Sequence, residues 1–482
     1  MNLNRTLTFL CLILLGNCEL SAQNLPAKTF WLGYLQTARI ILKIEDSVNN
    51  HKTGEFIFPI YNQSLKIDHI TITGDSLKVS LSKFNADYRA KLSADKSKLS
   101  GMWEQGGIKI GLTLKKTGDT TLRRPQTPRG PFPYREEKVT YYNNDKSIKY
   151  GATLTIPAAA KNAPAVILIT GSGQQDRDET LFDHKLFWVI ADHLTRNGIA
   201  VLRVDDRGIG ETKGDVMHAT SADFAKDVLV GVDYLKTHPG IDTKHIGLVG
   251  HSEGGVIGPL AAVQSKDIAF MVSLAGLGVK GSELLLRQSH DGYKKIGLTD
   301  NQILQLDSLT AGMMQLGRQG LTEKDLKPAF GKFFTNWSKS QPDSLLIKTG
   351  FKGPNSVDNI NAMAERFYMP WTLYLANYDP ATTLGRLTIP ILALNGKKDK
   401  QVSARENLAG FNKLLTKAGN KHFKTMALPG LNHFFQHANT GEVDEYAEIE
   451  ETISPEVLDI VTKWIQKEAR QPKINRRLSY LP

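Results

Sequence analysis

The chain has 482 residues, of which 41% are apolar and 23% are charged, and this composition excludes a disordered or fibrous protein. A chain of this length is longer than one hydrophobic core usually supports, so we expect two domains or one large domain with an insertion. The net charge of +11 is spread along the chain rather than gathered into a stripe, which argues against a nucleic-acid partner.

Residues 1–22 have the pattern of an export signal. Arg5 supplies the positive end, and the run from Leu7 to Leu15 is an apolar core that is too short to span a bilayer. Small residues then form a cleavage site that ends at Ala22. We therefore expect an exported protein, either periplasmic or secreted.

A lipoprotein is the competing interpretation of the same segment. Leu15-Gly16-Asn17-Cys18 resembles a lipid-attachment box, although asparagine is atypical before the cysteine. Attachment to a membrane is expected only in that case, through Cys18. The two cysteines of the chain, Cys11 and Cys18, both lie in this segment, so we expect no disulfide in the mature protein.

A small antiparallel β domain is expected over residues 23–120. Short runs that alternate apolar and polar residues follow one another from about Thr29 to Leu114, and this pattern favours a meander or a small barrel. We find no catalytic cluster there. Residues 121–135 contain four prolines between Pro125 and Pro133 and are interpreted as an extended linker.

Residues 136–482 are expected to form the catalytic domain. Apolar strands alternate with helices, which implies right-handed crossovers and a doubly wound, mostly parallel sheet. The expected strands are 138–142, 149–156, 165–170, 199–204, a run ending at 250, 268–274, 389–394 and 424–428, and the helices include 181–197 and 221–237.

Between about residues 277 and 386 this alternation stops. The segment has helical patterns and no strand like those of the sheet, so we expect a helical cap inserted beside the active site. Four aromatic residues of the segment are candidates to line an acyl pocket, namely Phe367, Trp371, Tyr374 and Tyr378. The simpler interpretation is that they pack helix against helix.

The stretch Gly250-His251-Ser252-Glu253-Gly254 joins an apolar strand to a helix. In a chain this rich in glycine, a Gly-x-Ser-x-Gly match is expected by chance in roughly one chain in five, so the bare pattern is weak and the flanking strand and helix carry the argument. They predict a sharp turn in which the serine has a strained positive φ and a Cβ on either glycine would clash. Ser252 is therefore the candidate nucleophile.

Two backbone amides are candidates for an oxyanion hole. One belongs to Glu253, at the start of the helix after the nucleophile. The other belongs to Ser172, in the loop Gly171-Ser172-Gly173 that follows the strand 165–170. Phosphate binding by this loop is a weaker interpretation, because no complete phosphate-binding motif is present.

An acid and a base follow the serine in the order Ser, Asp, His. Asp399 stands a few residues past the strand 389–394, and His433 follows the strand 424–428. Asp379 is the alternative acid, and His437 and His422 are the alternative bases. Asp379 and His422 are disfavoured because each of them precedes its strand.

Charged residues also fill the loops at this edge of the sheet. Arg207 lies in the loop after the strand 199–204, and Asp176 and Asp178 lie in the loop after the strand 165–170. We expect an ion pair between Arg207 and these carboxylates that locks the two loops together, in preference to a contact with substrate.

Six motifs together resemble the α/β-hydrolases, specifically the esterase D-like carboxylesterases related to the serine aminopeptidase (prolyl aminopeptidase-like) branch. The resemblance covers roughly Glu137 to Glu468. The motifs are Gly-Ser-Gly-x-x-Asp-Arg-Asp-Glu at Gly171, Asp-x-Arg-Gly-x-Gly at Asp205, Gly-His-Ser-x-Gly-Gly at Gly250, Tyr-Asp-Pro at Tyr378, Leu-Asn-Gly-x-x-Asp-x-Gln-Val at Leu394 and Asn-His at Asn432.

The resemblance implies hydrolysis of short acyl esters without a metal or a cofactor, with Ser252, Asp399 and His433 as the triad. One departure is Thr170, where many relatives carry a histidine before the oxyanion glycine. This difference concerns the geometry of the loop and leaves the reaction type unchanged.

We therefore expect a serine hydrolase that cleaves short-chain carboxylic esters through an acyl-enzyme intermediate. The alternative is an aminopeptidase-like exopeptidase, which would also need carboxylates such as Glu253 or Glu283 to hold a substrate ammonium group. A third hypothesis, a binding protein that acts through its β domain, is disfavoured by the ordered triad.

Overall fold

The computed structural model describes residues 28–35, 38–46, 52–58, 63–105, 108–118, 124–353 and 356–470. The expected export signal and both cysteines lie outside these residues. Contacts divide the chain into two units, Met1–Thr121 and Leu122–Pro482, and each is described by itself. Among the described residues, no helix is both long enough and apolar enough to cross a membrane.

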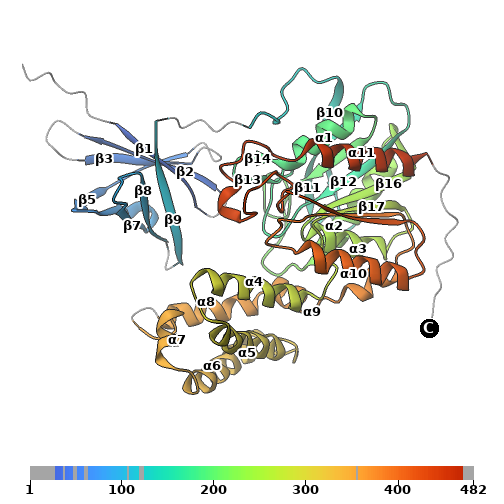
Figure 1. Cartoon of the computed structure of the whole chain (residues 1–482). Helices are drawn as coiled ribbons and strands as arrows, with labels where there is room; N and C mark the ends of the chain where they lie inside the picture. Colours follow the sequence, from blue (N-terminus) through green and yellow to red (C-terminus); the bar gives the residue numbers. More distant parts are fainter. Residues whose placement is uncertain are drawn as a thin grey trace, which may run out of the picture. The chain divides into compact units, whose positions relative to one another are not determined.

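The amino-terminal unit is a nine-stranded sheet in which every pair of neighbours is antiparallel (Figure 1). The strand order is β4-β3-β2-β1-β9-β8-β7-β6-β5. The strands are β1 (Thr29–Leu35), β2 (Ala38–Asp46), β3 (Lys52–Phe58), β4 (Gln63–Lys66), β5 (His69–Thr73), β6 (Ser76–Leu81), β7 (Ala86–Leu92), β8 (Lys98–Gln105) and β9 (Ile108–Thr117).

The two edge strands of this sheet, β4 and β5, are consecutive in the chain and separated by only two residues. The amide of Ile67 donates to the carbonyl of Gly54 in β3, and the amide of Asp68 donates to the carbonyl of Ser80 in β6, each at 3.0 Å. One kinked segment therefore pairs with both ends of the sheet and closes it into a barrel.

Side chains fill the interior of this barrel. Phe56, Tyr88 and Trp103 are almost fully buried and pack edge to face. Residues from all parts of the unit, such as Leu42 and Val79, complete the same apolar cluster. The barrel thus has a core of its own.

The second unit is built on an eight-stranded sheet of order β10-β11-β15-β12-β16-β17-β18-β19. The strands from β15 to β19 run parallel, whereas β10 and β11 add an antiparallel edge. The sheet is therefore mixed rather than uniform. Its strands are β10 (Tyr134–Tyr142), β11 (Lys149–Pro157), β12 (Ala163–Ile169), β15 (Ala200–Val204), β16 (Ile241–His251), β17 (Ile268–Leu274), β18 (Ile391–Gly396) and β19 (Phe423–Leu428).

Helices cover both faces of this sheet (Figure 1). α1 (Leu186–Arg196) and α11 (Pro455–Ala469) pack on one face, and α2 (Ser221–Thr237), α3 (Gly254–Ala262) and α10 (Ala404–Lys417) pack on the other. Alternate residues of β12 belong to the two apolar clusters, because successive side chains of a strand point to opposite faces. This double burial explains why the strand is apolar throughout.

The first helix begins later than the sequence pattern predicts. Residues 180–185 form a tight hairpin of β13 (Thr180–Leu181) and β14 (His184–Lys185), and α1 starts only at Leu186. Phe182 and Asp183 at the hairpin turn both have positive φ, at 52° and 61°. Two successive left-handed residues interrupt a helix, and the apolar pattern of residues 181–185 does not reveal them.

Between β17 and β18 the described residues form helices and turns with a separate apolar cluster. Phe367 and Tyr378 are buried in this cluster, as the simpler interpretation of packing between helices expects. The helices of this cap are α4 (Gly281–Lys295), α5 (Asp300–Gly317), α6 (Glu323–Lys339), α7 (Asp343–Lys348), α8 (Ser356–Tyr368) and α9 (Pro370–Asn377), followed by two short 3-10 turns, Pro380–Thr382 and Leu384–Arg386.

Candidate active site

Ser252 lies in the sharp turn between β16 and α3, and its φ is +52°. A Cβ on Gly250 would lie 2.1 Å from the carbonyl oxygen of Gly254, and a Cβ on Gly254 would lie 2.2 Å from the carbonyl oxygen of Ile169. Both contacts are shorter than any real one, so the turn requires glycine at both positions. The strained residue is the serine, as expected for a nucleophile elbow.

His433 and Asp399 are hydrogen-bonded to each other. His433 Nδ1 lies 2.7 Å from Asp399 Oδ2, and both side chains are almost fully buried. The other carboxylate oxygen, Oδ1, accepts the amides of Gln401 and Val402, each at 2.8 Å. Three donors thus fix the carboxylate, and the imidazole is left with Nε2 as its free nitrogen.

The imidazole of His433 lies beside the nucleophile elbow. Its ring centroid is 4.9 Å from that of His251, the residue before Ser252. Among the described residues, the hydrogen bonds of Ser252 are made by its backbone, to Leu274 and Gly255, and none is made by its hydroxyl. In a free enzyme the bond between nucleophile and base is often long and tightens only when substrate binds.

The loop that carries His433 is held against the end of β18. A Cβ on Gly396 would lie 2.2 Å from the carbonyl oxygen of Leu431, so the two backbones touch. Asn432 Oδ1 accepts the amides of Phe434 and Gln436 at 3.0 and 2.9 Å. Its amide therefore closes the turn around His433 and fixes the position of the imidazole.

The alternative acid and bases lie elsewhere. Asp379 caps a short turn by accepting the amide of Ala381 and sits 3.9 Å from Lys280. His437 is exposed and bonded to Glu451. His422 lies at the beginning of β19, at the opposite edge of the sheet. None of them is bonded to Ser252, Asp399 or His433 among the described residues.

Two backbone amides near the elbow have no partner among the described residues. The amides of Ser172 and Glu253 donate no hydrogen bond, whereas the neighbouring amide of Gly171 donates to Glu179 at 2.8 Å. Gly171 itself lies against Ser252, since a Cβ there would be 3.2 Å from Ser252 Cβ. Both unpaired donors are therefore available to an oxyanion.

A second carboxylate, Asp206, positions the loop after β12. Its Oδ1 accepts the hydroxyl of Thr170 at 2.8 Å and its Oδ2 accepts the amide of Gln175 at 2.9 Å. Thr170, the departure noted in the sequence, thus anchors the loop to the end of β15. Burial raises the pKa of Asp206 well above its ordinary value, more than these hydrogen bonds lower it.

The two loops are locked together, but by other pairs than the sequence suggested. Arg207 binds Asp227 of α2 at 2.6 Å, and not Asp176 or Asp178, so that prediction was wrong. Arg177 instead binds Asp205 at 2.6 Å, and Asp178 pairs with Arg203 of β15. Sequence placed these residues at one edge of the sheet, but which charge meets which depends on side-chain direction.

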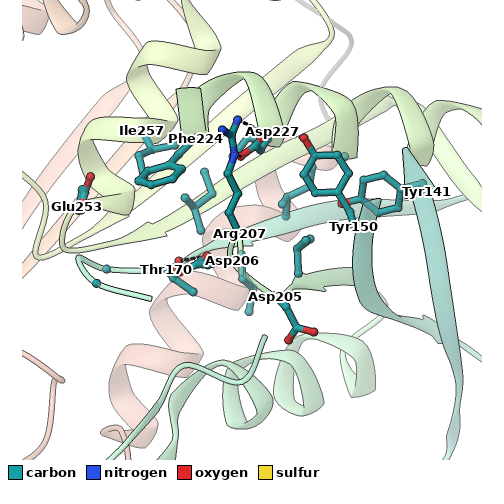
Figure 2. Close-up of a pocket in the computed structure, with 18 residues that line it drawn as sticks. Tyr141, Tyr150, Thr170, Asp205, Asp206, Arg207, Phe224, Asp227, Glu253 and Ile257 are labelled. Atoms are coloured by element: carbon teal, nitrogen blue, oxygen red, sulfur yellow. Dashed lines mark hydrogen bonds and ion pairs between the residues drawn. The ribbon is translucent and has the colours of Figure 1, made fainter. Parts of the chain in front are cut away.

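A small cavity of about 60 Å³ lies behind the loop after β12, next to α2 (Figure 2). Figure 2 shows the bond between Thr170 and Asp206 and the pair of Arg207 and Asp227 at its wall. The volume suffices for about two water molecules. Ser252 does not line this cavity, although the neighbouring Glu253 and Gly171 do, so the cavity lies beside the candidate nucleophile and not over it.

The side chain of Glu253 is buried between the sheet domain and the cap. Its Oε1 accepts the hydroxyl of Ser221 in α2 at 2.6 Å and the indole N–H of Trp371 in α9 at 2.7 Å. Burial raises the pKa of Glu253 despite these two bonds, which lower it. Trp371 is thus the one of the four predicted cap aromatics that is bonded to the elbow.

Ser252 follows the central parallel strand β16 on an elbow, Asp399 follows β18, and His433 follows β19. A serine, an acid and a histidine in this order at the ends of parallel strands are the arrangement of the α/β-hydrolase class. The family model described as serine aminopeptidase, S33, matches residues 185–287, which include the elbow. Esterase EstD of Thermotoga maritima is 24% identical over 428 residues, covering 84% of this chain and 88% of that protein.

Among solved structures, an esterase of Pyrococcus furiosus is similar over 73% of this chain and 99% of its own, at 15% identity and a TM-score of 0.41. The α/β hydrolase GrgF of Penicillium is similar over 70% of this chain and 98% of its own, at 18% identity and a TM-score of 0.42. The family match and the likeness to EstD confirm the resemblance inferred from the motifs, and they support a carboxylesterase-type hydrolase.

Proposed function

We propose that this protein is a serine carboxylesterase that cleaves short-chain esters through an acyl-enzyme intermediate. The observation that carries the proposal is the position of Ser252, at positive φ on its elbow, beside the hydrogen-bonded pair of Asp399 and His433. EstD of Thermotoga maritima, which is 24% identical to this chain over 428 residues, is named an esterase. The two unpaired amides near the elbow are consistent with the same chemistry.

In the proposed reaction the Ser252 hydroxyl attacks the ester carbonyl while Nε2 of His433 takes its proton. The amides of Ser172 and Glu253 donate to the oxyanion. The alkoxide then leaves with the proton from His433, and the acyl group remains on Ser252. Water then attacks the acyl-enzyme while His433 takes its proton, and His433 returns that proton to the Ser252 oxygen as the acid leaves. Asp399 holds the imidazole in the required tautomer throughout.

The surroundings of Glu253 count against the aminopeptidase alternative. An ammonium-binding carboxylate must offer its oxygens to the substrate, but Oε1 of Glu253 already accepts two hydrogen bonds from the protein. Glu283, the other candidate, is exposed on α4. Neither residue forms a built site for a substrate amine.

Replacement of Ser252 by alanine tests the proposal directly. With p-nitrophenyl acetate and butyrate as substrates, we expect S252A to lower kcat by about 10⁴-fold or more. S172A is a matched control, because it keeps the backbone amide and should retain nearly the full rate. Wild-type turnover by S252A would reject the assignment.

The preference for esters over amides needs a separate measurement. An acetyl ester and an aminoacyl anilide with comparable leaving groups are compared at equal enzyme concentration. We expect turnover of the ester and negligible turnover of the anilide, since neither Glu253 nor Glu283 is arranged to hold the amine. Faster cleavage of the anilide would favour the exopeptidase.

We also propose that the protein is exported, on the evidence of the signal-like pattern in residues 1–22. The intact mass of the mature protein tests this proposal. Cleavage after Ala22 gives a chain that begins at Gln23, whereas lipid attachment gives one that begins at a modified Cys18. Recovery of the full 482-residue chain would contradict both forms.

A further inference from the structure

A buried acid and a buried histidine lie under the active site, and the triad does not use them. Glu179 has no exposed surface, and His251 is only 1% exposed. Oε1 of Glu179 lies 2.9 Å from Nδ1 of His251. Glu179 follows β12 and His251 ends β16, so this pair joins the oxyanion loop to the nucleophile strand.

Each end of this pair touches a part of the catalytic machinery. Oε1 of Glu179 also accepts the amide of Gly171, the residue before the candidate oxyanion donor Ser172. Nε2 of His251 lies 3.1 Å from the carbonyl oxygen of His433. Since His251 is bonded covalently to Ser252, two side chains contact the oxyanion loop, the nucleophile and the base at once.

The hydrogen bonds define the protonation of His251. Both its partners, a carboxylate oxygen and a carbonyl oxygen, accept protons and have none to give. An imidazole that donates to both of these acceptors is protonated on both nitrogens, and this geometry favours the charged form of His251. Burial lowers the pKa of His251, but the charge of Glu179 and the hydrogen bonds to Glu179 and to the His433 carbonyl together outweigh burial, so the net pKa is raised.

The backbone at Glu179 supports a role for this side chain beyond packing. Its φ is +49°, a left-handed conformation that glycine adopts without strain. Its second oxygen, Oε2, is buried with no hydrogen-bond partner among the described residues. A strained residue that also buries an unpaired oxygen is typical of functional sites, where the surrounding structure offsets the cost.

We propose that Glu179 and His251 are positioning residues, whose ion pair sets the separation between the Ser172 amide, the Ser252 hydroxyl and the His433 imidazole. This inference rests on the proposed function, since the positions matter only if these groups react with an ester. The pair acts through the backbone of Gly171, Ser252 and His433 and does not itself touch the substrate.

The test compares three variants on p-nitrophenyl acetate. E179A removes both the charge and the acceptor, and we expect kcat to fall about 10²-fold while KM changes less than about 3-fold. E179Q keeps an oxygen that accepts from Gly171 and His251, and it should recover about half of that loss on a logarithmic scale. D227N breaks another partly buried ion pair, with Arg207, and should retain kcat.

A transition-state analogue separates positioning from general destabilisation. We expect the affinity of a boronic acid to fall in E179A by the same factor as kcat/KM, while binding of the carboxylic acid product stays within about 3-fold. A folded E179A with wild-type kcat would overturn the inference, and so would an equal loss in D227N. If E179A does not fold, E179Q and H251N carry the same comparison.

Labelling of Ser252 by a fluorophosphonate distinguishes a failure of this inference from a failure of the proposed function. If the wild-type protein is labelled but hydrolyses no ester, the ester assignment fails, and slower labelling of E179A still supports the positioning role. Equal labelling rates for wild type and E179A overturn that role. Absence of labelling in the wild type overturns both proposals.

Discussion

At the scale of single residues, the candidate catalytic groups were predictable and their supports were not. Ser252, Asp399 and His433 each follow a strand of the sheet, and the ends of parallel strands meet at one edge. Glu179 and His251 are part of the sequence motifs that begin at Gly171 and Gly250, but neither of them was predicted to have a function. Their pairing depends on which way two side chains point across 72 residues of sequence, and no periodic pattern encodes that direction.

Asp399→Asn tests the orientation of the imidazole. An amide in place of the carboxylate presents a donor or a weaker acceptor to Nδ1 of His433, which favours the wrong tautomer. We expect kcat to fall by about 10⁴-fold with little change in KM, measured on p-nitrophenyl acetate between pH 6 and 9. Asp379→Asn, at a half-buried position, is the control, and a comparable loss there would make Asp379 the acid.

Glu253→Gln tests the burial of the carboxyl group beside the elbow. The unfolded carboxyl ionises near its ordinary pKa of 4.5, whereas the folded pKa is raised by burial. Above pH 4.5 the unfolded state therefore loses a proton that the folded state keeps, and the wild type loses stability as the pH rises. Glutamine does not ionise, so the variant should gain stability relative to the wild type.

The measurement is the free energy of unfolding in urea, followed by tryptophan fluorescence from pH 4.5 to 8. The difference between E253Q and wild type should move in favour of E253Q across this range. Glu283→Gln, at an exposed site of the cap, should give a much flatter difference. A flat curve for E253Q as well would show that Glu253 is ionised as readily in the folded protein as in the unfolded chain.

At the scale of elements, the boundaries of helices were harder to predict from the sequence than their existence. α2 begins and ends where the sequence pattern places it, at Ser221 and Thr237, because a capping box of Thr220 and Asp223 marks its start. α1 lacks a side-chain cap and begins five residues later than the pattern suggests. Helix boundaries with a capping signal are therefore readable, and boundaries set by a hairpin are not.

Gly254→Ala tests the close approach of α3 to β12. The added Cβ would lie 2.2 Å from the carbonyl oxygen of Ile169, so the helix must move away from the strand that carries the oxyanion loop. We expect a loss of about 1–3 kcal/mol in the free energy of unfolding and a large drop in kcat. Gly385→Ala, where a Cβ meets nothing within 4 Å, should leave both unchanged.

Calorimetry and steady-state kinetics on the two variants give both quantities. The informative result is a kcat of G254A that falls further than the folded fraction does. Equal stability and activity for G254A and wild type would mean that α3 shifts to make room for the Cβ without moving the loop after β12. Glycine would then not be required at position 254.

At the scale of the whole molecule, the two units have separate cores and the site belongs to one of them. The sequence indicated an antiparallel unit before an α/β unit, because the apolar period changes from two residues to alternating buried strands and helices. It did not reveal how the first sheet closes. That closure depends on residues 67 and 68 pairing in opposite directions, which an alternating pattern cannot express.

Deletion of residues 23–121 tests the independence of the catalytic unit. Every candidate catalytic residue lies within Leu122–Pro482, so we expect kcat on p-nitrophenyl acetate to stay within about 2-fold of wild type. Arg124 and Gln126 must be kept, because they bond to backbone groups at Ala447 and Ile453. A folded deletion variant without activity would assign the barrel a part in catalysis.

The kinked segment that joins β4 to β5 also affects the tendency of newly synthesised chains to aggregate. Among the described strands of this sheet, each has a hydrogen-bonded neighbour, and the kinked segment pairs with both ends of the sheet, so the sheet presents no open row of amides and carbonyls to a strand of another chain. During translation the first domain can complete its pairing before the parallel sheet exists. The first domain of a newly made chain therefore has little tendency to pair with strands of another chain. This matters while the apolar strands of the second unit are still being synthesised.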